Sequence, residues 1–473
     1  MQPQSFPTRL VAIFAGELAS KGCVVAAFVW LARTLDPGPY GEVEWALSLT
    51  MVFSLFADAG LSTWALAQIA AKPDRAPTLV AEVGRLRLKL AVPTYALLLA
   101  TAWARGGDPG SALAIYGLIL FLSPLSLQYL FDGLLQTRWT AGGSAVRGAT
   151  FLVSVLLLVD RGSRPSAVAV AEVLAALALA MCHLLVLRRV FRLPVRVRQG
   201  RHDSLALLAR SWRIGASDVA WGVHTYAGLI VLGYASTPPD TAWYSASLRL
   251  FLALHTGVWL YLSTLLPTLA RLSHDNPQAW RRVVEQSLRI TGWAGCGAAL
   301  VGVLGADTIL TTVFGPPFTA AVPAFRAIIW VVPASWMSGH IRYALIAAQH
   351  PEREYRARLV GTATTIVLTL ILVPTYRSAG AAGALLGGTI VNAVAAWAHA
   401  RRVLPDCAYG PSLAPSSLCC LGCVTVGILL TPTIGEQPAT VISSALFVAA
   451  ALVLERERAP DLVRALAGAL GQA

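Results

Sequence analysis

The sequence predicts an all-α polytopic membrane bundle of about fourteen transmembrane helices, and three observations support this fold class. Of the 473 residues, 56% are hydrophobic and only 13% are charged, whereas a soluble globular chain carries about 25% charged residues. Apolar runs long enough to cross a bilayer recur from Leu10 to Leu454 with short breaks. Lysine and arginine gather in every second connection between these runs. A soluble fold is therefore excluded.

The first six predicted spans form an N-terminal lobe, residues 1–187. The first run is long enough to remain in the membrane as a signal anchor rather than to be cleaved. The fifth is among the weakest because it carries Arg147. The six spans are 10–32, 43–66, 88–104, 111–134, 141–159 and 167–187.

The remaining spans form a C-terminal lobe, residues 214–402, followed by two additional helices and a tail, residues 403–473. The ninth span is rich in glycine and the last two are also weak, so twelve helices is the alternative count. A basic linker, residues 188–213, joins the lobes; we interpret it as an anchor on anionic lipid, with partner binding as the alternative. The eight spans are 214–234, 242–269, 288–304, 320–348, 359–376, 379–400, 413–431 and 439–454.

The distribution of cations predicts the orientation in the membrane. One set of connections is strongly basic, including residues 72–89, 188–201 and 271–289. The alternate set holds only five cations. Because basic connections stay on the cytoplasmic side, both termini are predicted to be cytoplasmic. The five are Arg33, Arg105, Arg161, Arg164 and Arg377.

The net charge of +13 indicates anionic phospholipid as a partner and not nucleic acid, because the arginines flank helices instead of forming an aromatic-interleaved patch. The seven cysteines are odd in number and lie mostly in apolar runs, so neither a disulfide framework nor a metal site is expected. No phosphate-cradling glycine loop is present. We therefore expect no cofactor, and energy from an ion gradient, the membrane potential or mass action.

A faint internal repeat supports two parallel lobes. Residues 35–49 follow the first span and residues 236–250 follow the seventh, and each segment has a proline-bearing outer turn followed by a tyrosine and a small residue. Parallel repeats in transporters place a substrate cavity at their interface. The sequence therefore predicts a cavity between the lobes.

These segments resemble the polysaccharide-transporter, or oligosaccharide-lipid flippase, family of the multidrug/oligosaccharidyl-lipid/polysaccharide exporter superfamily. The similarity spans most of the chain and depends on the order and spacing of short elements. The elements are residues 32–41 (ARTLDPGPYG), Asp58-Ala59-Gly60-Leu61, residues 244–250 (YSASLRL), Pro267, residues 314–318 (FGPPF) and residues 380–384 (GAAGA).

The resemblance implies a flippase in the bacterial cytoplasmic membrane. Such a protein moves a polyprenyl-diphosphate-linked oligosaccharide to the outer leaflet by alternating access, and is not an enzyme. It also implies a polysaccharide polymerase and glycosyltransferases of the same pathway as partners. In one respect the chain departs from many relatives, which carry an aspartate in the seventh helix where this chain has Gly228; Asp218 lies about three turns earlier.

Cations within the spans are the predicted substrate-binding residues. Arg249 lies about 10 Å below the outer end of the eighth span and Arg326 about 9 Å into the tenth. A guanidinium at this depth is costly unless it faces water or an anion, and its planar fork suits phosphate oxygens. Lys21, Arg342 and Arg213 complete the set. The alternative for each is snorkelling, lipid anchoring or pairing with a carboxylate.

Four residues are predicted as ion-coupling candidates because each is titratable within an apolar run. Glu17 stands one turn before Lys21, so the two can form an intrahelical pair. Asp58 lies about 22 Å from the outer end of the second span. The alternative for these residues is a structural hydrogen bond in the packed core. The four are Glu17, Asp58, Asp218 and His255.

Three other functions remain open. A lipid-linked peptidoglycan-precursor flippase shares the predicted fold and an anionic cargo. A cation-coupled multidrug exporter of the same superfamily needs acid-rich lobes, against which Lys21, Arg249 and Arg326 argue. A membrane glycosyltransferase or polymerase needs a sizeable acidic outer loop, whereas the outer connections here are only a few residues long.

Overall fold

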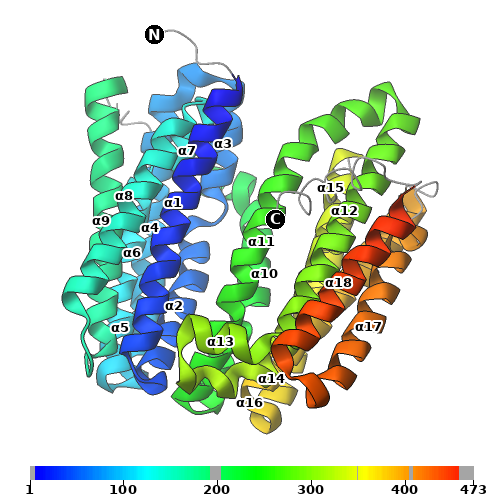
Figure 1. Cartoon of the computed structure of the whole chain (residues 1–473). Helices are drawn as coiled ribbons and strands as arrows, with labels where there is room; N and C mark the ends of the chain where they lie inside the picture. The colour runs from blue at the N-terminus through cyan, green and yellow to red at the C-terminus, as the bar shows by residue number, and fades with distance from the viewer. Residues whose placement is uncertain (1–5, 192–203, 349, 404–408, 457–473) are drawn as a thin grey trace. The chain divides into compact units, whose positions relative to one another are not determined.

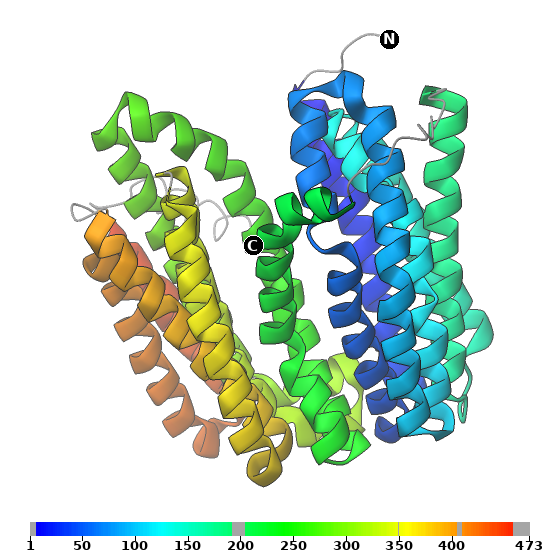
Figure 2. The ribbon, with the colours of Figure 1, turned by 180° about the vertical axis from the view of Figure 1, so that it is seen from behind.

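The computed structural model describes residues 6–191, 204–348, 350–403 and 409–456, and of residues 6–19 it describes the backbone alone. Within these ranges all regular structure is helical, as Figures 1 and 2 show from opposite sides. Residues 192–203 of the basic linker and residues 457–473 of the C-terminal tail lie outside the described residues, as does the Glu17 side chain. The chain divides into two compact units, described separately below.

Unit 1 comprises Met1–Tyr226 and Thr237–Ala242, and unit 2 comprises Ala227–Ser236 and Trp243–Ala473. The helices α10 (Ser204–Ala235) and α11 (Pro238–Asp275) each contribute to both. The other elements of unit 1 are α1 (Phe6–Thr34), α2 (Pro37–Asp58), α3 (Leu61–Ala71), η1 (Pro73–Arg75), α4 (Ala76–Arg105), α5 (Gly107–Gly117), α6 (Ile119–Leu122), η2 (Ser123–Leu125), α7 (Gln128–Gly133), α8 (Thr137–Leu158), α9 (Pro165–Val186) and η3 (Leu187–Phe191). The predicted lobe and linker boundaries stay predictions.

Unit 2 contains the remaining helices, and its helical structure is interrupted in two places. The chain between α12 and α15 is divided into three short elements, and α16 has a kink within it. The elements are α12 (Pro277–Leu304), α13 (Ala306–Phe314), η4 (Pro316–Ala321), α14 (Val322–Ile328), α15 (Val331–Ala347), α16 (Pro351–Val403), α17 (Tyr409–Ile434) and α18 (Glu436–Glu455).

Each of the fourteen predicted spans coincides with a helix or with a helix interrupted by a short break. By length and composition, the described residues hold 9 helices able to cross a membrane, or 10 when α2 and α3 count as one bent span. The helices α1, α4 and α10 are not among them, and they carry charges such as Lys21, Arg87 and Asp218. The all-α multi-pass fold is confirmed, and a count of fourteen is consistent with it.

The second predicted span is broken inside its apolar run. Ala59 and Gly60 both adopt left-handed conformations, with φ of 48° and 75°, so that α2 ends before α3 begins. The two helices are bent by 46° relative to each other. In α16 a single residue, Arg377, with φ of 48°, interrupts the helix between the eleventh and twelfth predicted spans.

Gly60 lies against the backbone of α10. A Cβ atom there would lie 2.3 Å from the Gly215 nitrogen and 2.8 Å from the Ser211 carbonyl oxygen. Because two backbones meet and φ is positive, we expect Gly60→Ala to cost on the order of 2 to 3 kcal/mol of stability. Thermal unfolding in detergent measures the loss. Gly142→Ala is the matched control, since nothing lies within 4 Å of its Cβ position; equal melting of both variants would contradict the close contact.

Two side chains satisfy backbone groups where helices of unit 1 are interrupted. The Asp108 carboxylate accepts hydrogen bonds from the Ser166 N–H and hydroxyl, at 3.1 and 2.9 Å, in the first turn of α9. The buried His183 accepts the Leu127 N–H on its Nδ1 at 3.1 Å, at the break before α7. A backbone group without a partner in lipid costs several kcal/mol. The His183 contact satisfies a backbone group at the break in the fourth predicted span, and the Asp108 contact does so at the start of α9.

In unit 2, α17 and α18 pack on α12, as both ribbon views show. Val441 and Val453 of α18 are 68% and 73% exposed, which suits a face turned to lipid. On the other face, the buried Glu455 accepts hydrogen bonds from Trp293 Nε1 at 3.1 Å and from Arg289 at 3.4 Å. The last described helix is therefore held to α12 by an ion pair within the core.

Candidate functional site

Lys21 lies on α1, about 20 Å from its predicted outer end at Thr34, and its side chain is exposed. None of the ion pairs among the described residues includes Lys21. The Glu17 side chain, the predicted partner, is outside the described residues. The preceding residue, Ser20, attaches α1 to α8 by donating a hydrogen bond to the Ser144 carbonyl at 2.7 Å.

A second cation lies deep in unit 1 and is paired. Arg147 of α8 donates to the Glu172 carboxylate of α9. The Glu172 side chain is 7% exposed and that of Arg147 is 31% exposed. The sequence analysis noted Arg147 but did not pair it with Glu172. The sequence does contain a signal for this pair, because Arg147 and Glu172 lie about 10 to 17 Å from the outer turn that joins their two spans.

The helix geometry turns Lys21 and Arg147 to the same side of the contact between α1 and α8. These helices run in the same direction and meet where Ser20 faces Gly148, whose Cβ position lies 2.8 Å from the Ser20 carbonyl oxygen. Lys21 follows Ser20 and Arg147 precedes Gly148. Since successive residues turn by about 100° in a right-handed helix, both side chains project toward one side.

Asp58 is engaged in a local network at the break between α2 and α3. Its Oδ1 lies 2.9 Å from Arg87 Nε of α4 and accepts the Ser62 hydroxyl at 2.5 Å. Oδ2 accepts the Ser62 N–H at 3.4 Å, in the first turn of α3. Arg87 is 7% exposed. Sequence reasoning assigned Arg87 to a basic connection and so did not anticipate the pair.

Arg249 and Arg326 of unit 2 occupy different surroundings. Arg249 is half-buried on α11. Arg326 is exposed on the short helix α14, and its Nε donates to the Val303 carbonyl at 3.2 Å. Val303 is one of the last residues of α12, so Arg326 satisfies a carbonyl that the helix end leaves without an intrahelical partner.

Arg342 joins an ionic cluster between α15 and α16. Its Nε lies 3.3 Å from Glu354 Oε1, and Arg358 donates to the same oxygen at 2.6 Å. The Arg342 guanidinium also lies 5.8 Å from the centre of the Tyr343 ring. Two arginines thus share one carboxylate.

The other predicted residues are dispersed. His255 of α11 lies with its Nδ1 3.4 Å from the Ser335 hydroxyl of α15 and packs on the Phe251 ring. Arg213 is exposed on α10 and contacts the Trp212 ring, and Asp218 is half-buried on the same helix. The roles of Glu17, Asp58, Asp218 and His255 in ion coupling stay predictions.

A polar chain across three helices of unit 2 was not anticipated. Tyr261 of α11 shares a hydrogen bond of 2.6 Å with the Ser287 hydroxyl of α12, which shares another of 2.6 Å with His340 Nε2 of α15. Single polar residues in long apolar runs give no sequence signal of this kind. Only the packing of the helices shows that they meet.

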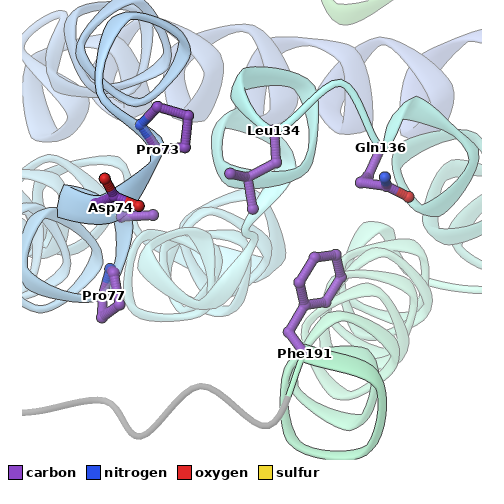
Figure 3. Close-up of a pocket in the computed structure, with 7 residues that line it drawn as sticks. Pro73, Asp74, Pro77, Leu134, Gln136 and Phe191 are labelled. Carbon is purple, nitrogen blue, oxygen red and sulfur yellow. The ribbon is translucent and has the colours of Figure 1, made fainter.

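A pocket of about 510 Å³ opens at the end of unit 1 where α4 begins (Figure 3). Asp74 and Gln136 are its polar lining side chains, and no cation lines it, so it does not suit a phosphate. None of the predicted substrate or coupling residues contributes to it. Its lining residues are Pro73, Asp74, Ala76, Pro77, Leu134, Gln136 and Phe191. No group of three or more metal-ligating side chains is found in the part of the chain that the structure describes.

The fold and the buried charges define a class, a multi-pass helical membrane protein with cations deep in its apolar helices. Residues 10–273 match the model of the family described as polysaccharide biosynthesis protein, which is more than half of the chain. The chain belongs to this family, which confirms the resemblance seen in the sequence. No curated protein matches the chain at a significant level.

Solved structures show the same fold at low sequence identity. A lipid II flippase MurJ in an inward closed conformation aligns with a TM-score of 0.74 and 12% identity, over 94% of this chain and 98% of that one. An inward-facing multidrug resistance MATE family transporter of the MOP superfamily aligns with a TM-score of 0.65 and 12% identity, over 83% and 98%. A MOP superfamily transporter from Pyrococcus furiosus aligns with a TM-score of 0.57 and 11% identity, over 88% and 95%.

Proposed function

We propose that this protein is a flippase that moves a polyprenyl-diphosphate-linked oligosaccharide from the cytoplasmic to the outer leaflet of a bacterial cytoplasmic membrane by alternating access. The family, polysaccharide biosynthesis proteins, supports a glycan cargo. The fold, shared with a lipid II flippase and with MATE transporters, supports transport. In this proposal both termini are cytoplasmic, and polymerase and glycosyltransferases of the same pathway are partners.

The observation that carries the proposal is the position of Lys21. An exposed ammonium about 20 Å from the helix end is near the bilayer midplane, where contact with lipid costs about 2.5 to 3.5 kcal/mol. This cost supports a position of Lys21 that faces water or an anion. Arg147, on the same side of the contact between α1 and α8, adds a guanidinium that Glu172 neutralises until an anion competes for it. A diphosphate is the anion that a lipid-linked glycan brings to this depth.

The buried carboxylates weigh against a multidrug exporter. Cationic drugs require unpaired acids, whereas Asp58, Glu172 and Glu455 each have an arginine partner in the structure. The match to MurJ favours a lipid-linked peptidoglycan precursor as the second candidate cargo. Both cargoes present a polyprenyl diphosphate to Lys21.

The test is translocation of a short-chain polyprenyl-diphosphate-linked N-acetylglucosamine by the purified protein in proteoliposomes. A galactosyltransferase added outside modifies only probe that has reached the outer leaflet, so its product reports the rate. We expect Lys21→Gln to slow translocation on the order of tenfold to a hundredfold, because a charge-assisted contact to phosphate is lost. Lys21→Arg keeps the charge and is expected to remain within a few-fold of the parent.

Two controls accompany this measurement. Lys89→Gln removes an exposed cation from α4 and is expected to leave the rate unchanged. A phosphatidylcholine analogue, which lacks the diphosphate, is expected not to be moved faster than in protein-free vesicles. Equal rates for Lys21→Gln and the parent protein would remove Lys21 from the substrate path, and no translocation by the parent would refute the proposed function.

A further inference from the structure

The polar chain of Tyr261, Ser287 and His340 connects a buried imidazole to the surface of unit 2. His340 is 0% exposed, Ser287 is 4% exposed and Tyr261 is 37% exposed. Both hydrogen bonds in the chain are 2.6 Å long. Each hydroxyl can donate one hydrogen bond and accept another, so the chain can pass a proton by reversing the direction of its bonds.

The His340 imidazole is held in the core with half of its hydrogen-bonding capacity unused. Its Nε2 faces Ser287, but the buried Nδ1 has no hydrogen-bond partner among the described residues. A buried polar atom without a partner costs about 1 to 3 kcal/mol, and an apolar side chain would avoid that cost. His183 in unit 1 also has a buried ring nitrogen without a hydrogen-bond partner, Nε2, but its Nδ1 accepts the Leu127 N–H and, among the described residues, no hydroxyl is hydrogen-bonded to its ring.

Several charged groups on the helices around α15 are paired with one another. Arg281 pairs with Glu285, Arg289 with Glu455, and Glu354 with both Arg342 and Arg358. No carboxylate among the described residues lies within ion-pair distance of His340. Other titratable groups on the helices of this region include Tyr244, His255 and Tyr261 of α11, Tyr343 of α15, Tyr355, Tyr376 and His399 of α16, and Tyr409 of α17.

We propose that His340, Ser287 and Tyr261 form a proton-binding site, and that its occupation loosens the contact of α15 with α11 and α12. In the tautomer with a proton on Nδ1, Nε2 accepts the Ser287 hydroxyl proton, Ser287 takes the proton of Tyr261, and hydronium at the surface returns a proton to the Tyr261 oxygen and becomes water. The product is an imidazolium with two N–H donors. The site uses unit 2 alone and does not depend on the glycan assigned above.

The loosening follows from the charge that the proton brings. The imidazolium has no carboxylate beside it, and its Nδ1–H has no acceptor in this conformation. In a conformation that admits water between α11 and α15, water solvates the positive charge and accepts the Nδ1–H hydrogen bond. That conformation therefore binds the proton more tightly. By linkage, acidification raises the population of that conformation, and neutral pH restores the tight contact.

The test measures the access of water to the interface between α11 and α15. Leu262 of α11 is 2% exposed, and its Cδ1 lies 3.3 Å from the Cβ position of Gly339 on α15. In a background without native cysteines, Leu262→Cys reports opening through its rate of labelling by a water-soluble maleimide. Thr264→Cys, exposed on the same helix, corrects for the effect of pH on the thiol itself.

We expect the labelling ratio of position 262 to position 264 to rise about threefold to fourfold between about pH 8 and about pH 6, the range in which a wet histidine titrates. His340→Gln keeps a hydrogen bond to Ser287 but does not titrate, so the ratio should stay flat. His183→Gln should leave the rise intact. Should His340→Gln fail to fold, the parent protein still decides, because a ratio that is flat between the two pH values overturns the proposal. A rise that persists in folded His340→Gln also overturns it.

Discussion

Arg147→Gln is expected to destabilise the protein by about 3 to 5 kcal/mol, because it leaves the Glu172 carboxylate in the core without its partner. The Glu172 side chain is only 7% exposed and cannot reach water. Glu172→Gln should cost less, since Arg147 is 31% exposed and its long side chain can turn toward water. The measurement is thermal unfolding in detergent, together with the yield of monodisperse protein.

A double-mutant cycle separates the pair from its surroundings. The double variant Arg147→Gln, Glu172→Gln removes both charges, and we expect it to recover most of the stability that Arg147→Gln loses. Arg138→Gln, an exposed arginine in the first turn of α8, is the matched control and should melt like the parent. If Arg147→Gln and Arg138→Gln melt alike, the two buried groups are not paired in the folded protein.

Much of the fold could be predicted from the sequence, because the membrane allows few backbone structures. A segment in lipid must satisfy its own backbone hydrogen bonds, so every long apolar run forms a helix. The predicted spans fall on helices for this reason. The break at Ala59 and Gly60 was not predicted, because the run remains apolar through residues 43–66 and nothing in its hydropathy marks a turn.

Only part of the candidate site could be predicted from the sequence. Hydropathy located Lys21, Asp58 and Arg249, since any charge within an apolar run is conspicuous. Partners depend on which helices are neighbours and which faces meet, and a single sequence does not specify these. Asp58 and Arg87 show the difference, because the aspartate was noticed and its arginine, at the edge of a basic connection, was not.

Arg326 shows that depth alone does not assign a role. Its distance along the tenth predicted span suggested a cation in a cavity. The structure places it after the short elements α13 and η4, with its Nε donating to a carbonyl at the end of α12, and its role in a cavity stays a prediction. Lys21 has no comparable contact among the described residues. The two cations differ in their surroundings although their hydropathy patterns are similar.

Asp58→Ala is expected to cost about 3 to 5 kcal/mol, since it removes two functions of one carboxylate. The side chain neutralises Arg87, which is 7% exposed, and it accepts the Ser62 N–H and hydroxyl at the start of α3. Asp58→Asn keeps an oxygen that can accept from Ser62, so we expect it to be more stable than Asp58→Ala by about 1 kcal/mol. Thermal unfolding of both variants in detergent measures the difference.

Combining Asp58→Asn with Arg87→Gln removes both charges while the cap of α3 remains, and we expect this double variant to be folded. It also decides between the structural role of Asp58 and its predicted role in ion coupling. Because the double variant has no titratable carboxylate at this break, retained dependence of probe translocation on a pH gradient means that Asp58 acts by holding α2, α3 and α4 together. Loss of that dependence in a folded double variant, with the translocation rate itself preserved, would instead identify Asp58 as the group that binds the coupling proton.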